Sequence, residues 1–125
     1  MGLTQTHGRA GEALAAAYLE LTGCTIRARN VRLGGVEVDL IVRDGATDVI
    51  VEVKFRGRSD YGGAAAAINH GKRARLVRAA HALERDGAAL QGGRAAARRV
   101  RIDVVAIELC AEGAAVRHYR SAVTG

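Results

Sequence analysis

The segment from Gly35 to Arg58 contains charged residues whose types and spacing could support chemistry. They interrupt runs of Val, Ile and Leu: Glu37, Asp39, Glu52 and Lys54. The apolar runs predict two β-strands, at about residues 36–43 and 48–55, separated by a turn at residues 44–47. Charges inside strands that read as buried are costly unless they have partners. The four residues are therefore candidates for one functional cluster.

The turn decides whether these side chains meet. If residues 44–47 form the hairpin loop, Asp39 stands opposite Glu52, with Cβ atoms about 5 Å apart. In the same register, Glu37 stands opposite Lys54. The apolar residues of both strands would then share the other side of the hairpin: Val36, Val38, Val51, Val53 and Phe55. A slip of one residue would separate Asp39 from Glu52, so the prediction depends on this turn.

Two carboxylates this close repel each other and raise each other's pKa unless a positive charge compensates. Lys54 supplies part of that charge. A divalent cation supplies more, because octahedral Mg²⁺, or Mn²⁺ in its place, accepts carboxylate, carbonyl and water oxygens. Such a metal can deprotonate a water and neutralise charge on a phosphate, while Lys54 positions the water or stabilises the transition state. The alternative is a solvated ladder of cross-strand ion pairs that contributes little stability.

The composition is that of a globular protein, with 49% apolar and 26% charged residues among 125. We expect one domain over residues 1–125, long enough to bury a core. The net charge of +6 suggests a polyanionic partner, but an aromatic content of 3% gives little support for base stacking. No apolar run approaches the ~18 residues of a membrane span, and no signal-peptide core is present, so we expect a cytoplasmic protein. Cys24 and Cys110 are expected to be buried, reduced thiols.

The elements that must position the cluster can be predicted along the chain. The first helix is expected from about Thr6 to Leu21, with Leu14 and Tyr18 at helical spacing and Gly23 as its C-cap. The remaining segments are a strand at residues 24–31, a helix from Ala64 to Asp86 broken near Asn69-His70-Gly71, a strand from Arg98 to Leu109, a strand from Ala115 to Arg120, and loops at Gly57–Gly63 and 87–97. The order α-β-β-β-α-β-β predicts a mixed α/β sheet with flanking helices.

Several motifs together resemble a known pattern. Asp39, then twelve residues, then Glu52-Val53-Lys54, is similar to the D…(D/E)xK signature of the restriction-endonuclease-like nucleases. Further matching segments follow in order: GRAGE (Gly8–Glu12), ARNVR (Ala28–Arg32), EVDLIV (Glu37–Val42), VEVKFR (Val51–Arg56), Tyr61-Gly62, Lys72 and RIDVVAI (Arg101–Ile107). Taken together, they resemble the YraN family of small bacterial proteins over nearly the whole chain.

That resemblance implies a restriction-endonuclease-like fold and Mg²⁺-dependent phosphodiester hydrolysis, because the family is similar to archaeal Holliday-junction resolvases. Branched or repair and recombination DNA is then the expected substrate class. The resemblance makes Asp39 and Glu52 the metal ligands, Lys54 the catalytic lysine, and Glu12 an acidic residue that completes the metal site. Lys72 would lie near enough to touch a phosphate. Symmetric cleavage of a four-way junction needs two active sites, and a homodimer would supply them.

Arginines that flank the cluster in sequence are candidates for phosphate contacts. They are Arg9, Arg29, Arg32, Arg56 and Arg58. Two other functions stay open beside the endonuclease: a non-catalytic nucleic-acid-binding protein on the same fold, and a structural module whose charges keep it soluble. The intact acidic pair with its lysine favours the endonuclease, and the net charge favours either nucleic-acid function over the third.

Overall fold

The structure is a computed structural model that describes residues 2–56, 69–90 and 99–124; for residues 2–8, 56 and 87–90 only the backbone is described. Its elements follow the chain in this order: α1 (Gly2–Leu21), β1 (Thr25–Leu33), β2 (Val36–Asp44), β3 (Thr47–Arg56), α2 (His70–Leu90), β4 (Arg99–Cys110) and β5 (Gly113–Val123). The order agrees with the predicted one. The predicted loop at Gly57–Gly63, and residues 91–97 of the second loop, lie outside the described residues.

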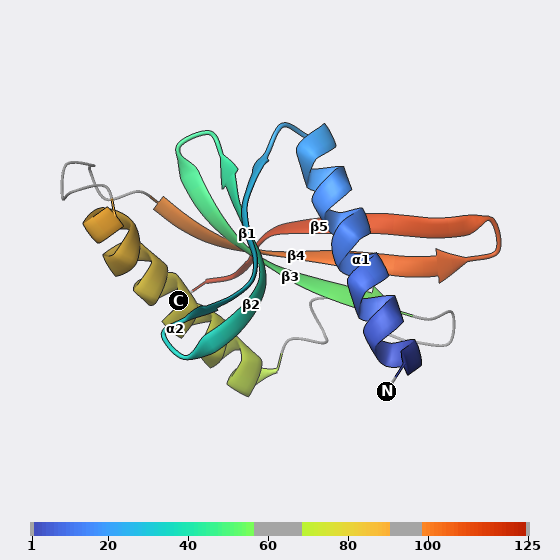
Figure 1. The fold of residues 1–125 in the computed structure, drawn as a ribbon, viewed down its shortest axis with the longest axis horizontal. Coiled ribbons are helices and arrows are strands. Elements are labelled where there is room, and N and C mark those ends of the chain that lie inside the picture. Colours follow the sequence, from blue (N-terminus) through green and yellow to red (C-terminus); the bar gives the residue numbers. More distant parts are fainter. Residues whose placement is uncertain (1, 57–68, 91–98, 125) are drawn as a thin grey trace.

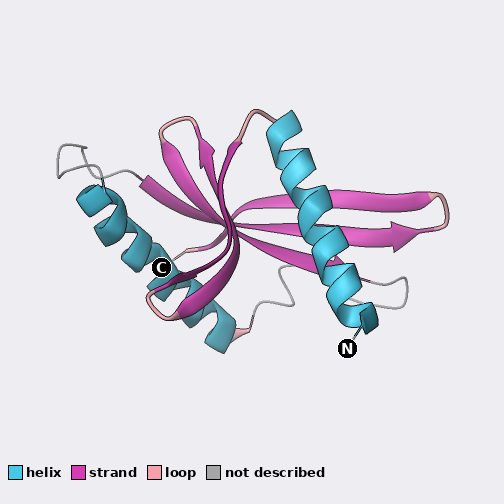
Figure 2. Ribbon diagram, in the orientation of Figure 1, coloured by secondary structure: helices cyan, strands magenta, loops and turns pink. Residues whose placement is uncertain are grey.

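One mixed sheet organises the molecule, with the strands in the order β1-β2-β3-β4-β5. Neighbouring strands are antiparallel except for β3 and β4, which are parallel and connected through α2. Figure 1 shows the strong twist of this sheet, and Figure 2 shows the two helices lying against it at separate places. The predicted mixed α/β architecture is therefore confirmed. Within the described residues, no helix has both the length and the apolar character that crossing a membrane needs.

Two apolar clusters cover the sheet, and each contains one helix. The first includes Leu76, Ala79 and Ala82 of α2, and the second includes Ala15 and Leu19 of α1. Small residues on both helices let the helix backbones approach the sheet closely. On α2, Leu76 and Ala80 are 2% and 7% exposed, and Leu83 packs against the same cluster, so the apolar spacing of these three residues marks the buried face of the helix.

The predicted apolar face of the first helix is correct only at Tyr18, which is partly buried and packs against the second cluster. Leu14 and Leu21 are exposed, whereas Ala15, Ala16 and Leu19 are buried. The larger leucines suggested the wrong side because alanine gives a weak hydrophobic signal. The helix does end as predicted. Gly23 has φ of +100°, and the N–H of Cys24 donates to the carbonyl of Leu19 over 3.0 Å, as in a Schellman motif.

Helix α2 begins at the predicted break. The side-chain oxygen of Asn69 accepts a 2.9 Å hydrogen bond from the N–H of Lys72, which makes Asn69 the N-cap and Lys72 the third helical residue. The last strand is longer than predicted, since β5 continues to Val123. One cysteine prediction was wrong: Cys24 is buried, but Cys110 is exposed at the end of β4.

Candidate functional site

The predicted register of the β2–β3 hairpin is confirmed where the two strands pair. Arg43 lies opposite Asp48, and the ladder continues as far as Leu40 opposite Val51. The ladder then stops, immediately before the two acidic residues. At the next position the N–H of Val53 donates to Oδ2 of Asp39 over 2.9 Å. A side-chain carboxylate therefore takes a β3 backbone donor at the point where the regular pairing ends.

The hairpin does not present all its apolar residues on one side, which corrects the prediction. Val36 and Val38 belong to the cluster around α2, whereas Val53 and Phe55 pack with the cluster around α1. On β2, Val38 packs in the cluster around α2, whereas Leu40 packs in the cluster around α1. These two residues are two positions apart and would share one face of a regular strand. The simple alternation of a flat strand is therefore broken at Asp39.

The neighbouring strand β1 is irregular at the same level. Arg29 pairs with Leu40 and Val31 pairs with Val38, which places Asn30 between them and across from Asp39. Asn30 has φ of +50°, a left-handed conformation that asparagine tolerates better than most residues. The irregular backbone of β1 therefore lies directly across from Asp39.

Asp39 and Glu52 lie close together, as predicted. The pKa of Asp39 is raised from 3.8 to about 7, mainly because burial penalises its charged form and because the Glu52 carboxylate repels it. The hydrogen bond from Val53 works in the opposite direction. Glu52 is itself buried, at 8% exposure. Near neutral pH, Asp39 is therefore close to the balance between holding and releasing a proton.

Two lysines surround the acidic pair. Nζ of Lys72 forms a 3.0 Å ion pair with Oε1 of Glu52. Burial, together with the neighbouring Lys72, lowers the pKa of Lys54. The pKa of Lys72 is raised, because hydrogen bonding with Lys54 and the charge of Glu52 outweigh the opposing effect of burial. One amine is therefore biased towards giving up its proton, and the other towards keeping it.

The predicted pairing of Glu37 with Lys54 is not part of the ladder. Glu37 lies opposite Arg32 on β1 instead, and Lys54 interacts with Lys72, Glu52 and Asp39. The strands separate before the position at which Glu37 and Lys54 would have met. Of the four charges predicted to form one cluster, three are thus held together, and Lys72 joins them from α2.

Glu12 is the outer member of the predicted acidic set. Its charge contributes to the raised pKa of Asp39, but less than burial and Glu52 do. In the part of the chain that the structure describes, no three His, Cys, Asp or Glu side chains gather as a ready ligand set for a metal. Asp39 and Glu52 could therefore hold a cation as a pair, together with water, whereas Glu12 acts on the site through its charge.

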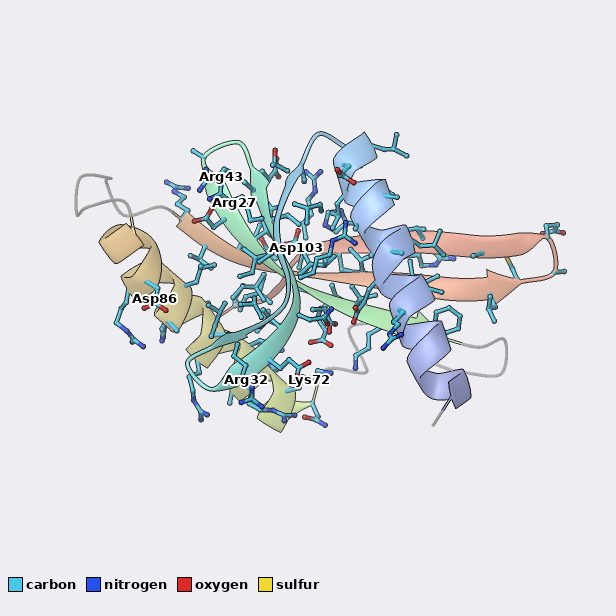
Figure 3. All side chains as sticks on the ribbon, in the orientation of Figure 1. Arg27, Arg32, Arg43, Lys72, Asp86 and Asp103 are labelled. Carbon is cyan, nitrogen blue, oxygen red and sulfur yellow. The ribbon has the colours of Figure 1, made fainter. Side chains whose placement is uncertain are left out.

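A cavity of about 410 Å³ opens beside the acidic pair. Its lining comes from β1, the β1–β2 turn, β2, β3 and α2: Arg32, Gly35, Val36, Glu37, Asp39, Glu52, Lys72, Arg75 and Leu76. Arg32 and Lys72 are labelled in Figure 3 near the first turns of α2. Of the other predicted phosphate contacts, Arg9 and Arg29 are exposed, Arg58 lies outside the described residues, and only the backbone of Arg56 is described.

A second buried carboxylate lies on β4. Asp103, which is labelled in Figure 3, is 0% exposed and accepts hydrogen bonds from Nε and Nη2 of Arg101 at 2.8 and 3.0 Å. Its Oδ2 lies 2.8 Å from Nε2 of His118, and its Oδ1 accepts the N–H of Ser121 over 3.0 Å. These bonds outweigh the opposing effect of burial and lower the pKa of Asp103. Asp103 is thus paired with Arg101, the residue two positions before it on β4.

Sequence reasoning missed two members of these sites. The role of His118 at Asp103 depends on an irregular β4–β5 register, where pairing shifts between Ile102 and Val104, and no local pattern signals it. Arg75 is exposed on α2, yet it also lines the cavity. Its position in the first turns of a helix, where basic residues are unfavourable, was the available signal.

Comparison with known proteins identifies relatives of this chain. A UPF0102 protein of Dechloromonas aromatica (strain RCB) is 52% identical over 77 residues, which are 62% of this chain and 64% of that protein. A UPF0102 protein of Bordetella petrii is 47% identical over 106 residues, 84% of this chain and 64% of that protein. The UPF0102 protein YraN of Salmonella arizonae is 49% identical over 74 residues, 59% of this chain and 56% of that protein. The chain thus spans less than two thirds of the length of these relatives.

Among solved structures, SfsA of Pyrococcus furiosus in complex with Ca²⁺ is similar, with a TM-score of 0.42 and 19% sequence identity. The match covers 98% of this chain and 65% of SfsA. A likeness this weak carries no argument about fold family or function, so the restriction-endonuclease-like assignment stays a prediction.

The motifs quoted from the sequence and the relatives therefore lead to the same family. The sequence profile of that family matches residues 11–107. These residues include Glu12, Asp39, Glu52, Lys54 and Lys72, all the acidic and lysine residues of the candidate site. The resemblance to YraN is confirmed, and the chain belongs to Uncharacterised protein family UPF0102.

Proposed function

We propose that this protein is a metal-dependent nuclease that hydrolyses phosphodiester bonds of nucleic acid at Asp39, Glu52 and Lys54. The observation that supports this most is the environment of Asp39. Its carboxyl group is partly buried, is repelled by Glu52 and has a pKa raised to about 7, although it accepts a backbone hydrogen bond. A carboxyl group whose charged form is disfavoured this strongly is typical of functional sites rather than of structural ion pairs.

The residues present fit a small divalent cation. Asp39 and Glu52 offer two adjacent carboxylates, and the hydrogen bond from Val53 fixes the orientation of one of them. Cation binding would relieve the repulsion that raises the pKa of Asp39. We propose Mg²⁺ or Mn²⁺ as the ion, since two carboxylates completed by water suit its oxygen-rich octahedral shell. When bound, it would act as a Lewis acid towards phosphate and water.

The chain's own lysines complete the proposed chemistry. Lys54 has a lowered pKa, which equips its Nζ to accept a proton from the attacking water or to orient that water. Lys72 has a raised pKa and stays charged, so it can hold Glu52 in place and attract a phosphate oxygen. One lysine is thus suited to moving a proton and the other to binding charge.

We propose DNA as the substrate, branched or arising in repair and recombination, and the cytoplasm as the compartment. The net charge of +6 agrees with a polyanionic partner. Symmetric cleavage of a four-way junction would need a homodimer, whereas flapped or single-stranded DNA would not. The oligomeric state in solution, measured by light scattering, therefore bears on which substrate is cut.

The test is cleavage of four-way, flapped and single-stranded DNA with Mg²⁺ or Mn²⁺, comparing the wild type with Asp39→Asn and Lys54→Met. We expect each variant to lower the cleavage rate by at least about a hundredfold, as the loss of one charge-stabilising group does. Glu20→Gln is the matched control, because it removes one exposed carboxylate of α1 and should leave the rate unchanged. Cleavage that survives Asp39→Asn would come from a contaminant and would overturn the proposal.

A second candidate, nucleic-acid binding without catalysis, has one observation in its favour. Glu52 already forms an ion pair with Lys72, and a lysine can replace a metal as the partner of a carboxylate. On this alternative no substrate is cut, Mg²⁺ does not bind at Asp39, and salt-dependent DNA binding survives Asp39→Ala. Calorimetric titration with Mg²⁺ at pH 8, comparing wild type with Asp39→Asn, separates the two candidates.

A further inference from the structure

The cavity beside the acidic pair is lined by both acidic and basic side chains. Asp39 and Glu52 line it, and Lys72 is bound to Glu52. Arg32 and Arg75 also line the cavity, from β1 and α2 respectively. Glu37 lies opposite Arg32 in the β1–β2 ladder, but among the described residues neither arginine forms an ion pair. The cavity therefore contains two guanidinium groups that no carboxylate of the described residues neutralises by an ion pair.

The start of α2 is unusually basic for a helix N-terminus. Asn69 caps the helix, and Lys72 stands at the third position, where a capping box would place glutamate or glutamine. The first turn contains no acidic residue, and Arg73 and Arg75 follow. Positive side chains near a helix N-terminus are unfavourable because the helix dipole is positive there. A bound anion would remove this conflict, since the dipole and the side chains would then act together.

Arg32 is held at a defined place relative to α2. Its Nη1 lies 3.3 Å from the carbonyl oxygen of Gly35, which ties the side chain to the β1–β2 turn. That turn packs directly on α2: a Cβ added to Gly34 would lie 3.1 Å from the Cβ of Ala82. Gly34 also has φ of +57°. The close packing fixes the turn against α2, and therefore fixes the backbone from which Arg32 extends in relation to the helix that carries Arg75.

We propose that Arg32 and Arg75 bind the phosphate next to the one that is cut, and so hold a nucleic-acid strand across the acidic pair. Guanidinium groups suit this role because their planar donors match phosphate oxygens in pairs. The inference rests on the proposed nuclease function and adds a second anion subsite to it. Arg32 and Arg75 act there as positioning residues, distinct from the groups that touch the reacting phosphate.

The first measurement is the binding of a fluorescent oligonucleotide by anisotropy, in EDTA, at several salt concentrations. We expect Arg75→Ala and Arg32→Ala each to lower affinity roughly tenfold and to reduce the slope of log K against log salt by about one. Arg85→Ala is the matched control, because it removes an exposed arginine from the same helix that does not line the cavity. It should change affinity less than twofold.

The second measurement locates the phosphate. Oligonucleotides carrying one neutral methylphosphonate at successive positions are bound by wild type and by Arg75→Ala, which forms a double-mutant cycle. We expect the methylphosphonate to weaken wild type but not Arg75→Ala at a single position next to the cleaved bond. In cleavage assays, Arg75→Ala should raise KM and leave kcat nearly unchanged.

The outcomes distinguish failure of the second anion subsite from failure of the proposed nuclease function. If wild-type protein binds no oligonucleotide, the nucleic-acid function itself fails. If wild type binds and cleaves while Arg75→Ala behaves like Arg85→Ala, the nuclease stands and the second subsite is overturned. The second subsite is also overturned if the coupling energy between Arg75→Ala and the methylphosphonate is the same at every phosphate position. Unchanged circular dichroism and unfolding midpoints for each variant exclude loss of fold as the cause.

Discussion

Asp39 and Asp103 are two carboxylates of one sheet in opposite circumstances. Asp103 is fully buried, yet Arg101, His118 and Ser121 hydrogen-bond to it, and its pKa is lowered. Asp39 is only partly buried, yet it faces Glu52 and its pKa is raised to about 7. The depth of burial therefore does not explain the direction of the two pKa shifts, because the more deeply buried aspartate has the lowered pKa. The two aspartates differ in their partners: positive and hydrogen-bonding groups surround Asp103, whereas the neighbouring carboxylate of Glu52 repels Asp39.

The largest expected effect is on stability at pH 7. Asp103→Asn should destabilise the protein by about 3 kcal/mol or more, because Arg101 loses its buried counter-charge. The isosteric change Asp39→Asn should cost less than ~1 kcal/mol, or should stabilise, because it removes the repulsion from Glu52. Urea unfolding followed by circular dichroism measures both. A similar loss in free energy of unfolding for both variants would contradict the difference between the two aspartates.

The two aspartates should also affect stability in different pH ranges. The folded pKa of Asp39, about 7, lies above its ordinary 3.8, so its contribution is complete below about pH 4 and is lost as pH rises through 7. We expect a loss of at least ~1 kcal/mol between pH 5 and 8 in wild type, and a flatter profile in Asp39→Asn. A profile unchanged by Asp39→Asn would contradict the raised pKa.

Asp103 should act in the opposite direction. Its folded pKa is lowered below 3.8, so the stability that it supplies is present above that pH and is lost as pH falls through the folded pKa. Asp103→Asn should therefore lower stability at pH 7 much more than at pH 3. This difference can be measured on the same samples by unfolding in urea at the two pH values.

A smaller effect is expected from the lysine beside the acidic pair. Lys72→Met should cost less than ~1 kcal/mol, because its 3.0 Å ion pair with Glu52 is partly exposed. The pKa of Lys54 should rise in this variant, since Lys72 is one cause of its lowering. Nuclear magnetic resonance of the lysine Nζ or Cε detects the change. A pKa of Lys54 that stays the same would place the two amines further apart than the structure has them.

The smallest effect concerns Glu12. Glu52→Gln and Glu12→Gln should both lower the pKa of Asp39, and Glu12→Gln should lower it less, because its charge contributes less than that of Glu52. Carbon-detected titration of the Asp39 carboxyl measures both shifts. An equal or larger effect of Glu12→Gln would move Glu12 into the acidic pair itself. No effect would remove Glu12 from the site.

The hairpin could be predicted because its information is local. The alternation of apolar residues and the short turn set the pairing from Asp44 opposite Thr47 to Leu40 opposite Val51. The arrangement beyond Leu40 could not be predicted in this way. Alternation assumes a regular ladder, whereas β2 and β3 separate at Asp39, across from Asn30 with its left-handed backbone. The asparagine was a local signal of that irregularity.

Local sequence patterns also could not predict the contacts between elements that are distant in the chain. The proximity of Lys72 to Glu52 depends on how α2 crosses the sheet, and the sequence suggested a role for Lys72 only through the family resemblance. The two residues that close the network around Asp103 depend on the irregular pairing of β5, where Ser121 adopts φ of +51°. Pairing within a strand, as between Arg101 and Asp103, was predictable because the two residues are separated by one position.

The parallel pairing of β3 with β4 has a consequence for folding kinetics. β2 and β3 meet through a short turn, so Asp39 and Glu52 can come together within microseconds. Thr47, however, pairs with Arg99, roughly fifty residues further along the chain. That contact requires closure of a long loop, and α2 with Lys72 lies inside it. The acidic pair should therefore form early without its lysine, and docking of α2 and β4 should be the slow event that completes the site.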